Sequence, residues 1–149
     1  MKDTPPPLPQ MLCFALYSAN HAMQAAYKPM LDAAGLTYPQ FLVLTLLWAE
    51  DDQTMSRIGA ALHLESNTLT PMLKRMEAAG LVVRNRDPED ERQVRLTLTE
   101  AGSALRLETA GFSRVIGEKT KMTSEALDAL RASIVTLRDI LREGENGQA

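Results

Sequence analysis

Three consecutive stretches of the chain decide its fold: Leu81-Val82-Val83-Arg84-Asn85-Arg86, then Asp87-Pro88-Glu89-Asp90-Glu91-Arg92, then Gln93-Val94-Arg95-Leu96-Thr97-Leu98. The outer two are β-like runs, whereas the middle one is charged and contains a proline, as turns often do. The pattern predicts a β-hairpin with a charged tip, which has the shape of a wing.

Two short helices are predicted before this hairpin, joined by a tight turn of about four residues. Thr54 caps the first, over residues 55–62. Ser66 caps the second, which continues to about residue 79 and closes at Gly80. Such a pair is typical of a helix-turn-helix. The acidic segment 50–52 before it is interpreted as a solvated turn.

Longer helical patterns precede this lobe. A helix is predicted over residues 10–34, ended by Gly35 and either kinked or cut short at Pro29. A capping box at residues 37–40 then opens an apolar helix that runs to about residue 48.

Two more helices are predicted after the hairpin. Thr99 caps the first, a long amphipathic helix over residues 100–121, and Thr123 and Ser124 precede the second. The first and last helices of the chain carry more apolar surface than the core of a small monomer covers. We therefore expect them to form the interface of a homodimer.

The predicted fold is mainly α with a small β-hairpin. A winged helix-turn-helix lobe occupies residues 36–99, and a helical dimerisation region combines residues 1–35 with residues 100–149, all within a single integrated domain. At 149 residues the chain is long enough for one such core.

Composition limits the classes of function. The net charge is −3, yet residues 57–98 carry seven Lys or Arg against six acids, so an anion-binding face must be local to the middle of the chain. The N-terminus has no apolar signal-peptide core, and no apolar run reaches membrane-spanning length. With a single cysteine, this predicts a cytoplasmic protein without membrane association. His21 and His63 are not spaced for metal binding, and we expect neither a metal nor a cofactor.

The second helix of the pair presents a polar face. Leu69, Leu73 and Met76 fall at helical spacing and are expected in the core. Small hydroxyls near the helix start suit base edges or phosphates, and cations further along suit phosphates. The candidate DNA-binding residues on this helix are Ser66, Asn67, Thr68, Thr70, Pro71, Lys74 and Arg75.

The hairpin tip adds a further candidate DNA contact. It offers Arg92, with Asp90 two residues earlier to orient the guanidinium, and an arginine on a wing suits a narrow minor groove. A solvated helix or a solvated turn explains either element alone. Both together, in this order, favour double-stranded DNA as a partner.

The tip sequence continues into Leu98-Thr99-Glu100-Ala101-Gly102, and with this layout nearly the whole chain resembles the MarR family of winged helix-turn-helix repressors. Three stretches are similar to its organic hydroperoxide-sensing subfamily, OhrR, of the one-cysteine type: Leu12-Cys13-Phe14-Ala15-Leu16-Tyr17, Gly35-Leu36-Thr37-Tyr38-Pro39-Gln40 and Thr68-Leu69-Thr70-Pro71-Met72-Leu73-Lys74-Arg75.

The resemblance implies that Cys13 is the peroxide-reactive thiol, and that Tyr27 and Tyr38 hydrogen-bond to it across the dimer. Asn67 departs from the glycine expected in this subfamily, which alters local DNA contacts and not the fold. The chain has no second cysteine, which excludes the intersubunit disulfide of the two-cysteine type. A low-molecular-weight thiol is then expected to complete the oxidation.

Spacing supports a sensing site shared between two chains. Tyr27 follows Cys13 by fourteen residues, or ~21 Å along a continuous helix, and cannot touch it. Only Tyr17, at i+4, reaches Cys13 within one chain. The thiolate is the reactive form, and no Lys or Arg lies between Lys2 and Lys28, so tyrosine hydroxyls must contribute most to stabilising it. The apolar neighbours of the thiol favour alkyl hydroperoxides over hydrogen peroxide.

The sequence thus predicts a redox-sensing repressor that binds a pseudo-palindromic operator as a reduced homodimer and leaves it when organic hydroperoxide oxidises Cys13. Two alternatives stay open. One is a MarR-type repressor released by a small aromatic ligand, with Cys13 structural. The other, less favoured, is a thiol peroxidase; the lack of a cation near the sulfur counts against it, and no enzymatic activity is expected.

Overall fold

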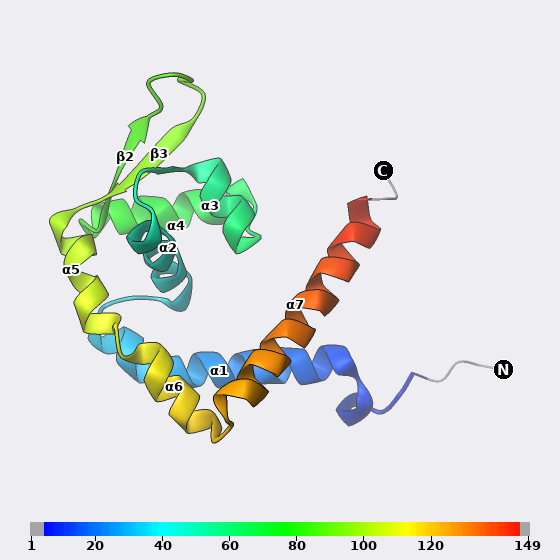
Figure 1. Cartoon of the computed structure of the whole chain (residues 1–149). Helices are drawn as coiled ribbons and strands as arrows, with labels where there is room; N and C mark the ends of the chain where they lie inside the picture. The colour runs from blue at the N-terminus through cyan, green and yellow to red at the C-terminus, as the bar shows by residue number, and fades with distance from the viewer. Residues whose placement is uncertain (1–4, 147–149) are drawn as a thin grey trace. The chain divides into compact units, whose positions relative to one another are not determined.

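The two β-like runs of the sequence pair as predicted. In the computed structural model they form an antiparallel hairpin of β2 (Val82–Arg86) and β3 (Val94–Leu98), whose tip projects from the helices around it (Figure 1). The register places Val82 opposite Leu98 and Arg86 opposite Val94. The charged turn between them is therefore the tip of the wing.

A third, very short strand joins this sheet. β1 (Gln53–Thr54) pairs antiparallel with β3, which gives the strand order β1-β3-β2. β1 was not predicted, because two polar residues after an acidic turn form no alternating pattern. Its position matters because β1 leads directly into the helix-turn-helix.

The structure describes residues 5–146, with side chains up to residue 144. The chain divides into two compact units, Met1–Phe112 and Ser113–Ala149. Residues 1–4 and 147–149, at the ends of the predicted dimerisation region, lie outside the described residues. The helices are η1 (Leu8–Gln10), α1 (Leu12–Ala33), α2 (Tyr38–Ala49), α3 (Met55–Leu62), α4 (Ser66–Ala78), α5 (Glu100–Thr109), α6 (Phe112–Thr120) and α7 (Ser124–Asn146).

Threonine caps begin three of the helices as predicted. Thr37 accepts a hydrogen bond from the Gln40 backbone while the Gln40 side chain accepts one from Thr37, which completes the capping box of α2. Thr54 and Thr99 cap α3 and α5 through their hydroxyl oxygens. The predicted cap at Ser66 is wrong: the N-cap residue is Glu65, whose carbonyl accepts the first bonds of α4.

One of the two outcomes expected at Pro29, an early end of α1, is wrong, and so is the single helix expected over residues 100–121. Pro29 does not end α1 early, since the helix continues to Ala33 and its last turns pack into the core through Tyr27 and Leu31. The long helix predicted over residues 100–121 is instead divided into α5 and α6. The division is at Gly111, because the next residue, Phe112, turns inward and lies buried against Phe41 with ring centroids 5.7 Å apart.

The core of the first unit lies between α2, α3, α4 and the sheet. Its fully buried side chains come from all of these elements, so the helix-turn-helix and the wing share one packed interior. The largest of them are Val43, Leu44, Leu47, Ile58, Leu69, Leu73, Met76, Val82 and Leu96.

Within residues 5–146, no single helix is both long and apolar enough to cross a membrane. α1 and α2 meet the length and composition only when counted together, across a bend of 74°.

Candidate functional site

The second helix of the helix-turn-helix, α4, separates a buried face from a polar one. Leu69, Leu73 and Met76 are buried, as the spacing predicts, and Met72 joins them. Of the candidate DNA-binding residues on this helix, Thr70 is half-buried and the others are exposed: Ser66, Asn67, Thr68, Pro71, Lys74 and Arg75. The predicted polar face is therefore available to a partner.

The turn between α3 and α4 depends on a close backbone approach. A Cβ added to Gly59 would lie 3.0 Å from the Leu64 carbonyl oxygen and 3.4 Å from the Leu69 side chain. His63 ends α3 in the left-handed conformation, with φ of 56°. Glycine at position 59 thus lets the turn pack tightly on α3 and holds α4 in place.

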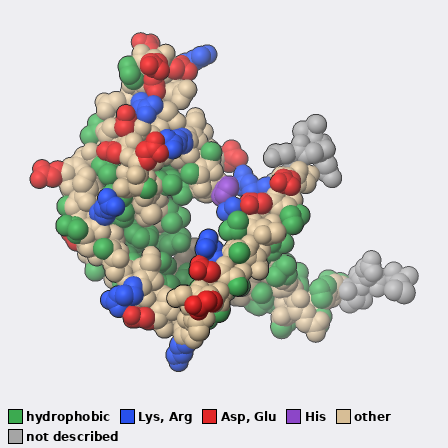
Figure 2. All heavy atoms as spheres, viewed as in Figure 1, with side chains coloured by type: hydrophobic (Ala, Val, Ile, Leu, Met, Phe, Trp, Pro, Cys, Tyr) green, Lys and Arg blue, Asp and Glu red, His purple; other side chains and the backbone are tan. Residues whose placement is uncertain are grey.

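The wing tip places its arginine as the sequence predicts. Asp90 Oδ1 accepts hydrogen bonds from both the backbone N–H and Nε of Arg92, each at 3.1 Å. The side chain of Arg92 is 91% exposed. Hydrogen bonding to Arg92 is the main reason why the pKa of Asp90 lies below its ordinary value. Charged side chains of both signs gather over this tip (Figure 2).

The acidic segment 50–52 is exposed, as expected of a solvated turn, and its side chains also make specific bonds. Glu50 forms two hydrogen bonds with the guanidinium of Arg57, at 2.6 and 2.7 Å. Asp51 accepts a hydrogen bond from the Leu98 backbone at 2.9 Å. These bonds tie the turn before β1 to the start of α3 and to the end of β3.

Asp52, the last acid of this segment, belongs to a cluster that sequence reasoning missed. Its Oδ1 accepts a hydrogen bond from Nε of Arg95 at 2.8 Å, and Nη1 of Arg95 donates to Asp87 Oδ2 at 2.9 Å. Arg95 and Asp52 are 43 residues apart in the chain, so no local sequence pattern predicts their contact.

Two of the three candidate tyrosines come together at the junction of α1 and α2. The rings of Tyr27 and Tyr38 lie 5.3 Å apart between centroids, and Phe41 lies 6.1 Å from Tyr27. Burial, followed by the nearby Tyr27, raises the pKa of Tyr38 above its ordinary value. The phenol of Tyr38 is therefore held in its neutral form, as a hydrogen-bond donor.

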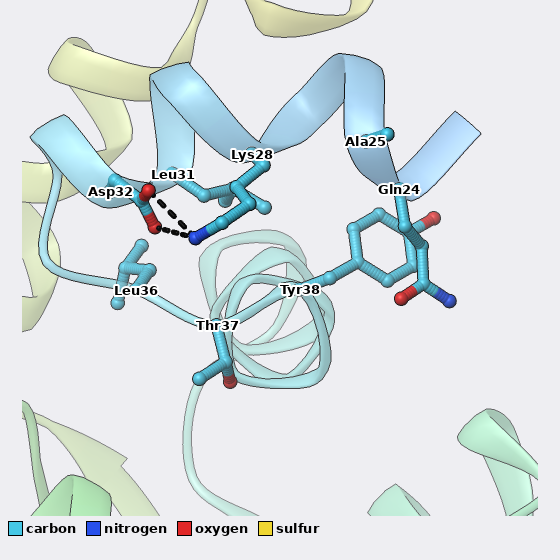
Figure 3. A pocket seen from close by; sticks show the side chains of 8 residues that line it. All are labelled: Gln24, Ala25, Lys28, Leu31, Asp32, Leu36, Thr37 and Tyr38. Carbon is cyan, nitrogen blue, oxygen red and sulfur yellow. Dashed lines mark hydrogen bonds and ion pairs between the residues drawn. The ribbon is translucent and has the colours of Figure 1, made fainter. Parts of the chain in front are cut away.

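A pocket of 290 Å³ opens beside Tyr38 (Figure 3). Figure 3 shows the Tyr38 ring next to the side chain of Gln24, with Lys28 on the same wall of α1. Nζ of Lys28 forms an ion pair with Asp32 at 2.8 Å. The sequence places no Lys or Arg between Lys2 and Lys28, and in the structure Lys28 lines this pocket beside Tyr38.

Cys13 lies apart from that pocket. It is exposed near the start of α1, with Leu12 and Tyr17 also exposed, at 61% and 60%. Because α1 is one unbroken helix, Cys13 and Tyr27 are separated by ~21 Å, as the spacing predicts. Tyr17, one turn after the thiol, places its ring 4.2 Å from that of His21. A single chain thus brings the phenols together and leaves the sulfur elsewhere.

Metal ligation finds no support in the described part of the chain. Between residues 5 and 146 there is no group of three or more His, Cys, Asp or Glu side chains arranged to hold a metal ion.

The chain is similar to known transcriptional regulators over nearly its full length. An organic hydroperoxide resistance transcriptional regulator of Bacillus subtilis is 43% identical over 91% of this chain and 92% of its own length. The regulator TtmR of Methylorubrum extorquens is 44% identical over 94% of this chain and 72% of its own. The structure of reduced AbfR bound to DNA is 36% identical, with a TM-score of 0.76, over 90% of this chain and 94% of its own. The crystal structure of AbfR of Staphylococcus epidermidis is also 36% identical, with a TM-score of 0.74.

The wing beside a helix-turn-helix defines the class of this protein, the winged-helix transcriptional regulators. Residues 25–107 match the family described as transcriptional regulator SarA/Rot. The chain belongs to the MarR family of transcriptional regulators, and within it resembles the organic hydroperoxide resistance regulators.

Proposed function

We propose that two copies of this chain form a repressor that binds operator DNA while Cys13 is reduced and leaves the DNA when an organic hydroperoxide oxidises Cys13. The names of two relatives support both halves of the proposal: one is an organic hydroperoxide resistance regulator, and reduced AbfR is bound to DNA. Acting on chromosomal DNA, the protein would work in the cytoplasm, away from the membrane.

The proposed DNA surface combines α4 with the wing tip. The exposed hydroxyls and cations of α4 enter the major groove, with Lys74 and Arg75 toward the phosphates. Arg92, exposed and oriented by Asp90, enters the flanking minor groove. In a two-fold dimer two such surfaces read a pseudo-palindrome whose half-sites lie about one helical turn apart.

One observation carries the redox half of the proposal: the thiol and the two phenols proposed to bind it are separated by most of the length of α1. Cys13 is exposed near the start of α1, whereas Tyr27 lies toward its other end, with its ring against that of Tyr38, the first residue of α2. A second copy related by a two-fold axis presents its own Cys13 to these phenols and completes two equivalent sites. The apolar residues exposed on α7 supply further dimer surface: Leu130, Ile134, Ile140 and Leu141.

The proposed oxidation has two steps. The Cys13 thiolate attacks the distal oxygen of the hydroperoxide ROOH; the S–O bond forms, the O–O bond breaks, and RO⁻ leaves and takes a proton from water to become the alcohol. The sulfenic acid then reacts with a low-molecular-weight thiol, giving a mixed disulfide and water. Sulfur is oxidised by two electrons and the peroxide is reduced.

In the proposed mechanism, α2 links the sensing site to the DNA-binding elements. Tyr38 is the first residue of α2, directly after the capping box, and α2 packs against α4 and β3 in the common core. Oxidation of Cys13 removes the thiolate and adds bulk to the sulfur, which breaks the proposed hydrogen bond from Tyr38. The position of α2 then changes, together with the positions of the elements that pack against it. A hundredfold weaker operator binding requires only ~2.7 kcal/mol of difference between the two states.

Operator binding tests the proposal directly. The probe is a fluorescent duplex selected by the wild-type protein from random-sequence DNA, titrated before and after one equivalent of cumene hydroperoxide with excess cysteine. We expect a loss of affinity of about a hundredfold in the wild type and none in Cys13→Ser. Equal release of both proteins by the peroxide would contradict a role for the thiol.

A second candidate function rests on a second pocket. A cavity of 300 Å³ between the start of α2 and α4 is lined by Thr37, Pro39, Gln40, Leu64, Thr68, Met72 and Arg75. Its size and its mixture of apolar side chains with one guanidinium suit a small aromatic acid. Release of the operator by such a ligand, at the same concentration for wild type and Cys13→Ser, supports a ligand-responsive repressor with a structural cysteine.

Peroxidase turnover is not part of the proposed function. Under the proposal one hydroperoxide is consumed for each Cys13, and regeneration is slow. Sustained consumption of cumene hydroperoxide in excess thiol, at many equivalents per chain, would establish an enzyme instead.

A further inference from the structure

A continuous series of ion pairs and hydrogen bonds runs from the turn before β1 to the wing tip. We call Asp52, Arg95, Asp87 and Asp90 the wing brace. Arg95 is at its centre, with 30% of its side chain exposed: Nε donates to Asp52 at 2.8 Å and Nη1 donates to Asp87 at 2.9 Å. Nη2 of Arg95 also donates to the backbone carbonyl of Asp52.

Asp87 connects the sheet with the tip through its two carboxylate oxygens. Oδ2 accepts the hydrogen bond from Arg95, while Oδ1 accepts from the backbone N–H groups of Glu89 and Asp90, at 2.8 and 3.2 Å. Only 11% of this side chain is exposed. Asp90 in turn holds Arg92, so the chain of contacts ends at the predicted DNA contact.

The other end of the wing brace is fixed to the helix-turn-helix. Asp52 precedes β1, and β1 pairs with β3 and leads directly into α3. Asp52 has φ of 55°, a conformation that only Gly, Asn and Asp adopt readily. A two-stranded ribbon alone is a weak support for its tip, whereas the wing brace ties the tip to the lobe that carries α4.

We propose that Asp87 and Arg95 are positioning residues for operator binding: they set the angle of the wing tip to the helix-turn-helix and so present Arg92 in a preorganised conformation. This inference rests on the proposed DNA-binding function. Preorganisation matters because an exposed arginine loses side-chain freedom when it enters a groove, and a tip that is already ordered reduces that cost.

Two isosteric variants test the wing brace. Asp87→Asn still accepts hydrogen bonds from the tip backbone but loses the charge that pairs with Arg95. Asp52→Asn loosens the opposite end and keeps a residue that tolerates positive φ, so its fold is preserved even if Asp87→Asn is unstable. Glu118→Gln is the control, because it makes the same change in net charge by removing an exposed ion pair within α6.

The experiment is a double-mutant cycle with Arg92→Ala, measured as affinity for the duplex selected by the wild type. We expect Asp87→Asn, Asp52→Asn and Arg92→Ala each to weaken binding by about tenfold, and each double variant to bind as Arg92→Ala alone does. Asp87→Asn should also lower the slope of log affinity against log salt by about 1, as Arg92→Ala does, because one cationic contact is lost. A merely structural defect reduces the active fraction without changing that slope.

The possible failures are distinguishable. If Asp87→Asn and Asp52→Asn weaken binding as much in the Arg92→Ala background as in the wild type, the wing brace does not act through Arg92 and the inference is overturned, while DNA binding by the proposed surface stands. If Arg92→Ala alone binds normally, the proposed wing contact fails, and the inference fails with it.

Discussion

The indole N–H of Trp48 donates a hydrogen bond to the carbonyl of Gly102 at 2.9 Å, joining the last turn of α2 to the first turn of α5. The bond thus joins two residues that are 54 positions apart in the sequence. Since Tyr38 begins α2, this bond anchors the far end of the helix on which the proposed sensing site depends.

The close approach at Gly102 predicts a strong effect of a single methyl group. A Cβ at this position would lie 2.1 Å from the Leu81 carbonyl oxygen, and backbone must move to admit it. We expect Gly102→Ala to destabilise the protein by at least about 1–3 kcal/mol, measured by urea unfolding. The matched control is Gly117→Ala in α6, where no atom lies within 4 Å of the added Cβ and a helix former is expected to be neutral or stabilising. Equal stability of the two variants contradicts this packing.

Acid sensitivity follows from Asp87. Its hydrogen bond to Arg95, followed by that to the Glu89 backbone, holds the pKa of Asp87 below its ordinary value. Because the folded-state pKa is lowered, the group contributes stability above the unfolded pKa of about 3.9, and this contribution is lost as pH falls through the folded value. We expect the unfolding free energy to fall less steeply below pH ~4 in Asp87→Asn and in Arg95→Gln than in the wild type. Urea unfolding between pH 7 and 2.5 measures this. If the unfolding free energies of the variants fall with pH in parallel with that of the wild type, the Asp87–Arg95 pair does not contribute to acid sensitivity.

The phenol of Tyr38 is expected to control the reactivity of the thiol. In the proposed site, removing its O–H in Tyr38→Phe takes one hydrogen-bond donor from the thiolate, and should slow alkylation of Cys13 at pH 7 by about tenfold. The measurement is the rate with iodoacetamide from pH 5 to 10. Tyr17→Phe should have the smaller effect, because its ring is mostly exposed and lies against that of His21. A larger effect at Tyr17 would place the donor within the same chain.

Mixed dimers separate a shared site from a site within one chain. In the proposed dimer each site takes Cys13 from one copy and Tyr27 with Tyr38 from the other, so a Cys13→Ser chain paired with a chain carrying Phe at both tyrosines keeps one complete site. We expect this dimer to respond to cumene hydroperoxide although neither parent homodimer does. The control pairs a wild-type chain with a chain carrying all three substitutions, which leaves no complete site. The reverse pattern, a responsive control and an unresponsive mixed dimer, shows that the site is formed within one chain.

Local signals explain what the sequence predicted correctly. The hairpin followed from β-like runs around a charged turn, and the caps at Thr37, Thr54 and Thr99 followed from single residues in recognisable positions. The separation of Cys13 from Tyr27 needed only helix geometry, because the two lie on one helix. In each case the information lies within a few turns of chain.

The misses have a common physical origin in tertiary packing. The contact of Arg95 with Asp52 joins residues far apart in sequence, and β1 exists only because β3 lies beside it. Pro29 is kept inside α1 by packing of the helix end into the core, which local propensity does not register. The break at Gly111 likewise follows from the burial of Phe112.

Because α1 is unbroken, the number of residues between Cys13 and Tyr27 fixes both the distance between them and their relative direction around the helix. Each inserted residue advances the helix by about 1.5 Å and rotates everything beyond it by about 100°, so the thiol and the phenols cannot drift apart gradually over evolutionary time. In the proposed dimer, one added residue between Cys13 and Tyr27 would point the sulfur away from the phenols of the opposite chain, and only changes near a whole number of turns would restore its direction. Side chains along this stretch can therefore vary far more freely than its length.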